Sequence, residues 1–142
     1  MVDYGFAIRM AELARLSPSD TVLEIGSGIG NLTEILSERA KLVYAIEIDP
    51  LLVHIASRRL QKRNVRFIRG DFLKIDLPPF DKVVCNPPYC IISKIIERLS
   101  QLDFEVSVMT VQKELASRMV AEPGTKEYGR FTVLCYLNFD IE

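Results

Sequence analysis

The sequence predicts an α/β fold in which a mostly parallel central sheet is flanked by helices. Short apolar runs rich in β-branched residues alternate with segments whose apolar residues recur at helical spacing, a pattern typical of βαβ units. A glycine-rich turn at residues 26–30 follows the first apolar run and opens a helix. The 142 residues, 49% hydrophobic and 26% charged, are enough for one domain with a buried core and leave no room for a second large one.

Each expected element has a signal of its own. Strands are predicted where about four to eight apolar and β-branched residues occur together, and helices where apolar residues recur every three or four positions. A proline within residues 17–20 ends the first helix. The expected elements are, in chain order, a helix over 6–16, a strand over 21–25, a helix from the glycine turn to about residue 39, a strand over 42–48, a helix from 49 to about 63, strands over 65–69 and 82–85, a helix over 93–100, a strand over 104–111 and a helix over 113–121.

The helix that begins at residue 49 has the clearest start. Asp49 is a good capping residue, and Pro50 suits the first turn. The inward face of this helix is expected to hold Leu51, Leu52, Ile55 and Leu60. The final segment, 131–142, stays open: residues 131–137 fit a strand by their β-branched content, or a short helix that leads into an edge strand.

Composition limits the class of protein. No run approaches the ~18 to 20 apolar residues that span a bilayer, and the N-terminus lacks the basic-then-apolar order of a secretion signal, so we expect a cytoplasmic protein without membrane association. Cys85, Cys90 and Cys135 form no ligand-spaced cluster, which favours reduced thiols and no bound metal. Because the net charge is −1, nucleic-acid binding would need a local patch. The sequence gives no basis for predicting an oligomeric state.

The glycine turn is the first candidate site. Glycine lets the backbone approach a ligand closely, and such turns bind many nucleotides. Here Gly26, Gly28 and Gly30 have the spacing Gly-x-Gly-x-Gly, not the Gly-x-Gly-x-x-Gly of dinucleotide-binding proteins. The methionine part of a methyl donor requires only that the backbone of the turn comes close to it. An acidic residue just before the turn, here Glu24, is typical of methyl-donor sites. The turn therefore favours S-adenosylmethionine over NAD, with Glu24, Gly26 and Gly28 as cofactor-binding residues.

Polar residues after the next two strands complete the candidate cofactor site. Glu47, near the end of the second strand, can accept hydrogen bonds from two ribose hydroxyls. Asp49 competes for that role, but its position at a helix start assigns it to capping, and Ile48 then offers an apolar flank to adenine. Asp71 follows the third strand and can accept from the adenine amino group, with Phe72 packing nearby. The alternative for Asp71 is a turn aspartate that caps local N–H groups.

Asn86-Pro87-Pro88-Tyr89 follows the fourth strand and is the sharpest motif. The amino group of adenine is a poor nucleophile because its lone pair is delocalised into the ring. Two acceptors at its hydrogens, the Asn86 side-chain oxygen and the Pro87 carbonyl, would turn that lone pair toward a sulfonium methyl, and the prolines hold these acceptors in place. Tyr89 can stack on the base. The motif predicts methyl transfer to an exocyclic nitrogen with Asn86, Pro87 and Tyr89 as catalytic residues, whereas a plain proline turn explains neither Asn86 nor Tyr89.

With these motifs the chain resembles the catalytic domain of the ribosomal RNA adenine N6,N6-dimethyltransferase family, in particular its archaeal and eukaryotic members. The resemblance covers nearly all 142 residues. Its most specific part is the last stretch, because the other motifs occur in many methyltransferases. The matching segments are residues 22–26, 45–49, 70–71, 86–89, 112–114 and 123–130.

The resemblance implies a Rossmann-like S-adenosylmethionine-dependent methyltransferase fold. It implies two successive methylations at N6 of each of two neighbouring adenosines in small-subunit ribosomal RNA during ribosome biogenesis. The partner would be that RNA or the pre-ribosomal small subunit. Gly26, Glu47, Asp71 and Asn86 would contact the cofactor.

Candidate contacts to the substrate lie in two places. Tyr89 is expected to stack on the target base, and Tyr128 and Arg130 are expected to meet the substrate near the active loop. The densest basic stretch, residues 58–69, can meet RNA phosphates together with Lys126 and Arg130. A solvated helix face is the alternative for residues 58–63.

Three departures from the family pattern leave alternatives open. Pro87 stands where the family carries leucine or isoleucine. The resulting motif, Asn-Pro-Pro-Tyr, is commoner in DNA adenine and protein glutamine methyltransferases. At the N-terminus, family members carry a Gln-Asn/His-Phe-Leu segment, and Met1 stands at the position of its leucine. At the other end, the chain stops near the expected sixth strand. We therefore expect one domain over 1–142, truncated near the sixth strand and without the C-terminal helical domain, in which cofactor binding survives better than turnover. A catalytically silent ribosome assembly factor is the non-enzymatic alternative.

Overall fold

Five parallel strands form the central sheet in a computed structural model that describes residues 3–142. The departure predicted at Met1 lies outside the described residues. The chain divides into two compact units. Residues 3–87 with Asp103–Thr110 form the first unit, and Pro88–Leu102 with Val111–Glu142 form the second.

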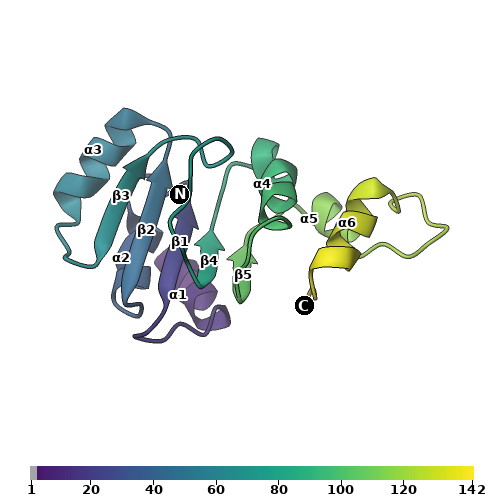
Figure 1. Ribbon diagram of the computed structural model, residues 1–142, viewed down its shortest axis with the longest axis horizontal. Helices are drawn as coiled ribbons and strands as arrows, with labels where there is room; N and C mark the ends of the chain where they lie inside the picture. The colour runs from purple at the N-terminus through teal and green to yellow at the C-terminus, as the bar shows by residue number, and fades with distance from the viewer. Residues whose placement is uncertain (1–2) are drawn as a thin grey trace. The chain divides into compact units, whose positions relative to one another are not determined.

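The first unit holds the whole sheet and three helices (Figure 1). Strands β1, β3 and β4 have the predicted bounds, while β2, β5 and the helices are shorter than predicted. The elements are α1 (Tyr4–Leu13), β1 (Thr21–Ile25), α2 (Asn31–Ser37), β2 (Leu42–Glu47), α3 (Pro50–Arg59), β3 (Val65–Arg69), β4 (Lys82–Cys85) and β5 (Val106–Met109).

The strand order is β3-β2-β1-β4-β5, and every neighbouring pair is parallel. From the central β1 the chain moves outward to β2 and β3, and then returns to the other side of β1 to form β4 and β5. Parallel strands present their carboxyl ends at one edge, and open α/β sheets bind ligands there, at the point where the strand order reverses. That point lies between β1 and β4.

One face of this sheet packs against α1 and α2. Side chains alternate along a strand, so residues two apart share a face, and burial of each valine, leucine or isoleucine contributes about 1.5–3 kcal/mol. The same alternation places Glu24 and Glu47 on this face, at the carboxyl ends of β1 and β2. The buried residues that form this core are Ala7, Met10, Ala11, Ala14, Val22, Leu32, Ile35, Leu36, Ala40, Val43, Val65 and Val84.

The predicted inward face of α3 is partly wrong. Leu51 and Ile55 are 62% and 40% exposed, whereas Ala56 is buried within the helix and Leu60 just after it. The reason is that α3 approaches its neighbours through the small Ala56, so that only a narrow strip of the helix is covered. The predicted capping role of Asp49 is confirmed, since its Oδ1 accepts from the Leu51 N–H at 2.8 Å.

The second unit is helical. It holds a 3₁₀ turn (Tyr89–Ile91), α4 (Ile92–Leu99), α5 (Lys113–Met119) and α6 (Arg130–Asn138). Residues 131–137 belong to α6, so the strand predicted over them is wrong and the short helix is confirmed. The edge strand expected after that helix does not form within residues 139–142. Two side chains join α5 to α6: Thr132 Oγ1 donates to the Arg118 carbonyl at 2.6 Å, and the Arg118 guanidinium lies 5.4 Å above the Phe131 ring.

The described residues contain no helix that is both long and apolar enough to cross a bilayer. Residues 3–142 also hold no group of three or more His, Cys, Asp or Glu side chains suited to a metal ion. Burial raises the pKa of the Cys85 and Cys135 thiols. Neither cysteine is therefore a reactive thiolate near neutral pH.

Candidate functional site

A hollow of about 350 Å³ lies in the first unit, at the carboxyl ends of β1 and β4. It brings together the glycine turn that follows β1 and the asparagine that follows β4. Four predicted site residues, Glu24, Gly26, Gly28 and Asn86, therefore share one cavity at the point where the strand order reverses. The full set of lining residues is Glu24, Gly26, Ser27, Gly28, Ile29, Asn31, Leu32, Leu52 and Asn86.

The glycine turn needs left-handed backbone at three positions. Gly26, Gly28 and Gly30 have φ angles of 77°, 57° and 92°, which glycine adopts without steric cost. A Cβ at Gly30 would lie 2.7 Å from Leu60 Cδ1, so packing requires glycine there. A Cβ at Gly28 would meet nothing within 4 Å, so the space over Gly28 is open to a ligand.

Gly28→Ala is expected to weaken S-adenosylmethionine binding about tenfold, because the added methyl group would occupy this open space. The left-handed backbone should cost only about 1–2 kcal/mol of stability. Gly30→Ala is the matched control: it adds a clash with Leu60 to the same backbone penalty, so it should lose more stability. Titration calorimetry and urea unfolding of both variants would check this, and unchanged affinity in Gly28→Ala would contradict it.

Glu47 ties the glycine turn to the end of β2. Its Oε2 accepts from the Gly28 N–H at 2.8 Å, and its Oε1 accepts from the Asp49 N–H at 3.1 Å. A carboxylate has about four acceptor positions, so both oxygens keep capacity for another donor. The predicted contact between Glu47 and ribose hydroxyls is compatible with this arrangement and stays a prediction.

Glu24 is a buried carboxyl group in the wall of the hollow. Its side chain is 1% exposed, and its Oε2 accepts from Thr33 Oγ1 of α2 at 2.5 Å. Burial raises the pKa of Glu24 to about 8; the Thr33 hydrogen bond opposes the rise, and the nearby Glu47 carboxylate adds to it. Glu24 is therefore mostly protonated at neutral pH when nothing compensates its charge.

Ser27 supports the view that a ligand belongs in the hollow. Its Oγ is buried and has no hydrogen-bond partner within residues 3–142. A buried hydroxyl without a partner costs about 1–3 kcal/mol. A polar ligand atom in the hollow would remove that cost, so the residues present fit the predicted cofactor.

Asn86 is held at the hollow from β5. Thr110 donates its side-chain hydroxyl to Asn86 Oδ1, and its N–H donates to the Cys85 carbonyl at 3.3 Å. An amide oxygen has two lone pairs, so Asn86 Oδ1 keeps one for an incoming amine. Pro87, the source of the second predicted acceptor, follows in the same unit and is buried.

Three further predicted cofactor residues lie, like Glu47, in the first unit but not among those that line the hollow. Ile48 is 63% exposed, and Phe72 is buried. Asp71 Oδ1 accepts from the Leu73 N–H at 2.9 Å, so one oxygen of Asp71 caps a local N–H group, as the alternative for this residue predicts. Lys74 Nζ lies 4.0 Å from its other oxygen. The contacts predicted for these three residues with the cofactor stay predictions.

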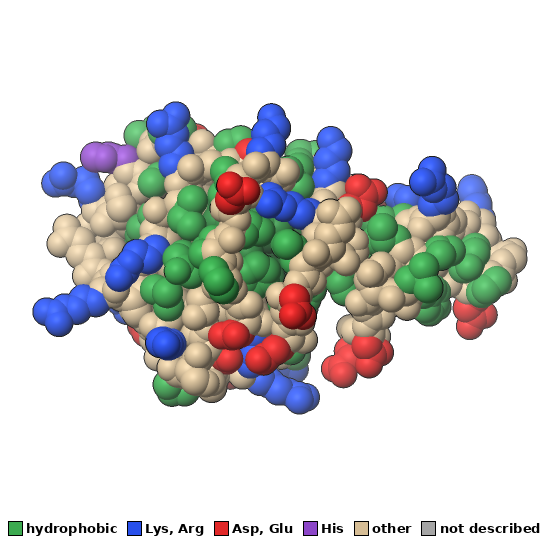
Figure 2. Space-filling view, viewed as in Figure 1, with side chains coloured by type: hydrophobic (Ala, Val, Ile, Leu, Met, Phe, Trp, Pro, Cys, Tyr) green, Lys and Arg blue, Asp and Glu red, His purple; other side chains and the backbone are tan. Residues whose placement is uncertain are grey.

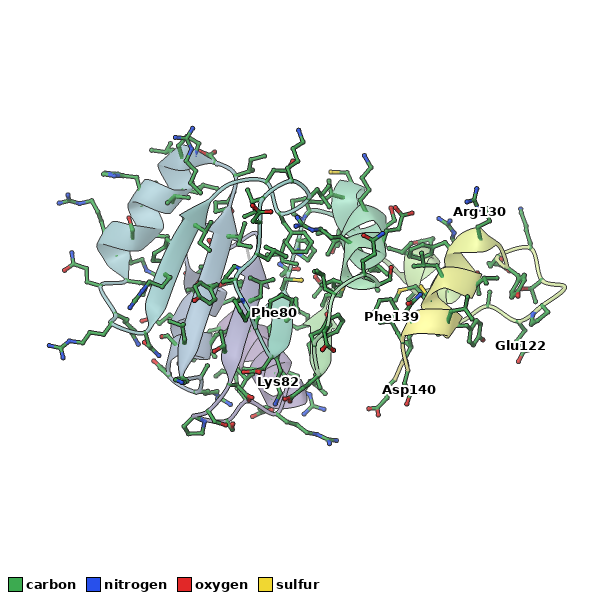
Figure 3. The ribbon with its side chains drawn as sticks, viewed as in Figure 1. Phe80, Lys82, Glu122, Arg130, Phe139 and Asp140 are labelled. Carbon is green, nitrogen blue, oxygen red and sulfur yellow. The ribbon has the colours of Figure 1, made fainter. Side chains whose placement is uncertain are left out.

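The predicted substrate contacts Tyr89, Tyr128 and Arg130 belong to the second unit. Tyr89 begins the 3₁₀ turn and is exposed, and Arg130 is the first residue of α6 (Figure 3). The Gly129 N–H, between Tyr128 and Arg130, donates to Thr132 Oγ1 at 3.1 Å, which fixes the start of α6. Their roles in substrate binding stay predictions.

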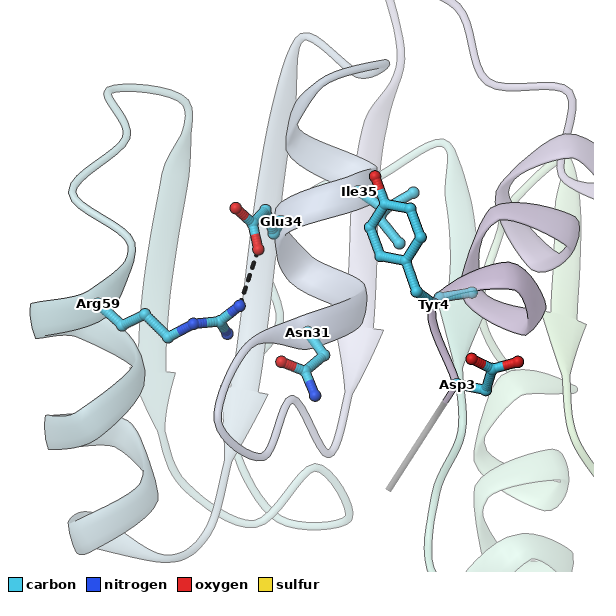
Figure 4. A pocket seen from close by; sticks show the side chains of 7 residues that line it. Asp3, Tyr4, Asn31, Glu34, Ile35 and Arg59 are labelled. Atoms are coloured by element: carbon cyan, nitrogen blue, oxygen red, sulfur yellow. Dashed lines mark hydrogen bonds and ion pairs between the residues drawn. The ribbon is translucent and has the colours of Figure 1, made fainter.

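A second hollow, of about 400 Å³, lies in the first unit beside α1, α2 and α3 (Figure 4). It shares Asn31 with the first hollow. Its guanidinium group, that of Arg59, is already paired with Glu34 at 2.8 Å and donates to the Ile29 carbonyl at 2.9 Å. Although it is larger, this hollow holds none of the predicted site residues.

In the basic stretch at residues 58–69, two side chains are paired with carboxylates and a third is hydrogen-bonded to the backbone. Arg59 pairs with Glu34, Lys62 Nζ lies 3.7 Å from Glu38 Oε1, and Arg66 donates to backbone carbonyls. On the face shown in Figure 2, the Lys and Arg side chains over this part of the first unit stand apart and form no continuous patch. The solvated-face alternative is thereby favoured for the helical part of the stretch.

Sequence reasoning missed several residues of the site. Ser27 and Asn31 line the hollow, and Thr33 and Thr110 donate hydrogen bonds to Glu24 and Asn86. Ser27 and Asn31 lie within or next to the glycine turn, so proximity to that motif was a usable signal. Thr33 and Thr110 gave none, because their partners are distant in sequence or on another element.

Comparison with known proteins identifies related chains. A family model described as "Ribosomal RNA adenine dimethylase" matches residues 5–142. The chain is 50% identical over 137 residues to a Methanosarcina acetivorans protein named "Probable ribosomal RNA small subunit methyltransferase A". That alignment covers 96% of this chain and 51% of the relative, so the chain spans about half the length of the curated relatives it matches.

Two solved structures share the fold. A dimethyladenosine transferase from Plasmodium falciparum superposes with a TM-score of 0.88 at 36% identity, over 95% of this chain and 51% of that one. The 23S rRNA methyltransferase ErmE superposes with a TM-score of 0.83 at 33% identity, over 96% and 56% of the respective chains. Together with the parallel sheet, these similarities confirm the predicted fold class.

Proposed function

This chain belongs to the ribosomal RNA adenine dimethylase family, and on that basis we propose that it transfers methyl groups from S-adenosylmethionine to N6 of adenosines in small-subunit ribosomal RNA. The observation that carries the proposal is the shared hollow: the glycine turn after β1 and Asn86 after β4 line one cavity. A donor site at the glycine turn and an acceptor for an amine at Asn86 would therefore lie side by side.

Residues in and beside the hollow would divide the tasks of this reaction. The bound donor would supply an electrophilic sulfonium methyl group. The glycine turn would pass close to its methionine part, and Glu47 would hold its ribose while bracing the Gly28 N–H. Asn86 Oδ1 and the Pro87 carbonyl would accept from the amino group of the adenine and aim its lone pair. Catalysis by orientation and electrostatics needs no general base before attack.

In the second unit, Tyr89 would stack on the target base, and Tyr128 and Arg130 would contact the RNA. Base stacking on an aromatic ring is worth about 1–3 kcal/mol. Asp71, Phe72 and Ile48 would surround the adenine ring of the donor. The proposed partner is the small ribosomal subunit or its precursor, which the name of the Methanosarcina acetivorans relative supports.

The proposal can be tested in two steps on the chain as it stands. Calorimetry should first show binding of S-adenosylmethionine. Incubation with donor labelled on its methyl group should then label unmethylated small-subunit particles, and nuclease digestion should release N6,N6-dimethyladenosine. Large-subunit particles, DNA and a protein release factor are the parallel substrates. Label only in DNA or in protein would overturn the proposal. Donor binding without transfer to any substrate, even by a chain extended at both ends to the length of its relatives, would favour the silent assembly factor.

A further inference from the structure

Glu24 puts a carboxyl group in the wall of a hollow that has no cationic side chain of its own. The remaining lining residues are glycines, Ser27, Asn31, Asn86 and aliphatic side chains, all of them neutral. Glu24 is 1% exposed, so water cannot screen its charge as it would at a surface. A ligand in this hollow therefore meets a carboxyl group whose ionisation it can influence strongly.

The groups around Glu24 supply no compensating positive charge. The Thr33 hydroxyl of α2 donates to it at 2.5 Å, Glu47 of β2 adds a second carboxylate, and β4 contributes the neutral Cys85 thiol. Arg59 of α3 donates to the Ile29 carbonyl of the glycine turn, and its guanidinium is paired with Glu34. The missing positive charge would thus have to come from the ligand.

The protonation of Glu24 has a definite sign. Burial raises the pKa of Glu24 from an ordinary value of 4.5 to about 8, with Thr33 opposing and Glu47 reinforcing the shift. Between these two pH values the folded chain holds a proton that the unfolded chain has lost. The contribution of Glu24 to stability is therefore present below pH 4.5 and falls as the pH rises toward 8.

We propose that the buried Glu24 carboxyl selects the cationic methyl donor over its neutral product, and that it releases a proton to solvent when the donor binds. This inference rests on the proposed function. S-adenosylmethionine carries one more positive charge than S-adenosylhomocysteine, because methyl transfer converts its sulfonium into a thioether. The donor favours the ionised carboxylate, so the carboxyl proton leaves on binding. Once the methyl group has gone, the carboxylate regains a proton from solvent and the product is held less tightly.

The proton release can be counted on the unmodified chain. Titration calorimetry at pH 7 in buffers with different ionisation enthalpies should show close to one proton released for each S-adenosylmethionine bound, and clearly less for S-adenosylhomocysteine. Glu24→Gln should remove this difference, because glutamine can still accept from Thr33 but carries no proton to release. Glu34→Gln is the matched control, since that carboxylate pairs with Arg59 at the other hollow and should leave the proton count unchanged.

Affinities measured from pH 6 to pH 9 give a second readout. The preference of the unmodified chain for donor over product should increase about tenfold over this range, as Glu24 becomes ionised without needing the ligand. In Glu24→Gln the preference for donor over product should not increase beyond the change caused by titration of the ligand amino groups. That titration affects the unmodified chain and the variant alike. Donor binding with equal proton release for donor and product, or a wild-type pattern in Glu24→Gln, would overturn this inference and leave the proposed function standing. Failure to bind the donor at every pH would overturn both.

Discussion

Lys82→Met is expected to lower the free energy of unfolding by about 3 kcal/mol, as breaking a buried ion pair does elsewhere. Lys82 is the first residue of β4 (Figure 3), so it lies at the opposite end of that strand from Asn86 and the hollow. Its Nζ lies 3.0 Å from Asp20 Oδ2 and donates to the Arg15 carbonyl at 2.7 Å. Methionine keeps the aliphatic stem but leaves the Asp20 carboxylate and the Arg15 carbonyl without this partner.

The cost arises because both charges are shielded from water. Each side chain of the pair is 9% exposed. Asp20 would keep its hydrogen bonds from Ser17, including that from the Ser17 N–H at 2.8 Å. Lys62→Met is the matched control: Lys62 and Glu38 form a pair at 3.7 Å with exposed side chains, and its loss should change stability by less than about 1 kcal/mol. Urea unfolding of both variants would check the difference, and equal stabilities would contradict the prediction.

The effect of Lys82→Met should also depend on pH. Burial raises the pKa of Asp20, but the hydrogen bonds from Ser17 and the ion pair with Lys82 outweigh it and leave that pKa below its ordinary value of 3.8. A depressed pKa contributes stability that is present above pH 3.8 and is lost as the pH falls through the folded value. The stability difference between the unmodified chain and Lys82→Met should therefore be largest near neutral pH and shrink in acid.

The strands could be predicted from local sequence, but the faces of the helices could not. β1 and β4 begin and end where their apolar runs do, since both lie inside the parallel sheet and are buried along nearly all their length. β3 also has the predicted bounds, although it is an edge strand with exposed arginines. The helix predicted to run to residue 63 ends at Arg59, and Leu51 faces solvent. Its leucines satisfy helical spacing, yet the contact of Leu60 with Gly30 and the burial of Ala56 decide which face is covered.

The site residues that could be predicted are those that end or directly follow a strand. Glu24, Gly26 and Gly28 follow or end β1, and Asn86 follows β4, so parallel pairing alone brings them together. Thr110 could not be found, because its role depends on β5 lying next to β4 and on a side-chain contact across that pair. The structure of residues 131–137 was ambiguous for a similar reason, because it also depends on another element. The β-branched content of this segment favours a strand, but in the structure it is a helix that contacts α5.

Asn86→Ala is expected to slow methyl transfer about 10²–10³-fold, the usual loss when one preorganised polar group is removed from an active site. The affinity for S-adenosylmethionine should fall less than about fivefold, because the glycine turn and Glu47 remain. The effect belongs to the reaction step, since alanine cannot accept the hydrogen of the adenine amino group and leaves its lone pair delocalised. Single-turnover assays on unmethylated small-subunit particles, with calorimetry for donor affinity, would separate the two quantities.

Thr110→Val tests whether the position of the Asn86 amide matters as well as its presence. Valine has nearly the shape of threonine but cannot donate to Asn86 Oδ1, so the amide would lose the contact that holds it from β5. Transfer should slow by about tenfold, less than in Asn86→Ala, because the acceptor persists in a less ordered orientation. The double variant should be no slower than Asn86→Ala alone, since Thr110 acts through that amide. A double variant slower by the product of both effects would show that Thr110 acts independently, and an unchanged rate in Asn86→Ala would remove the asparagine from the reaction.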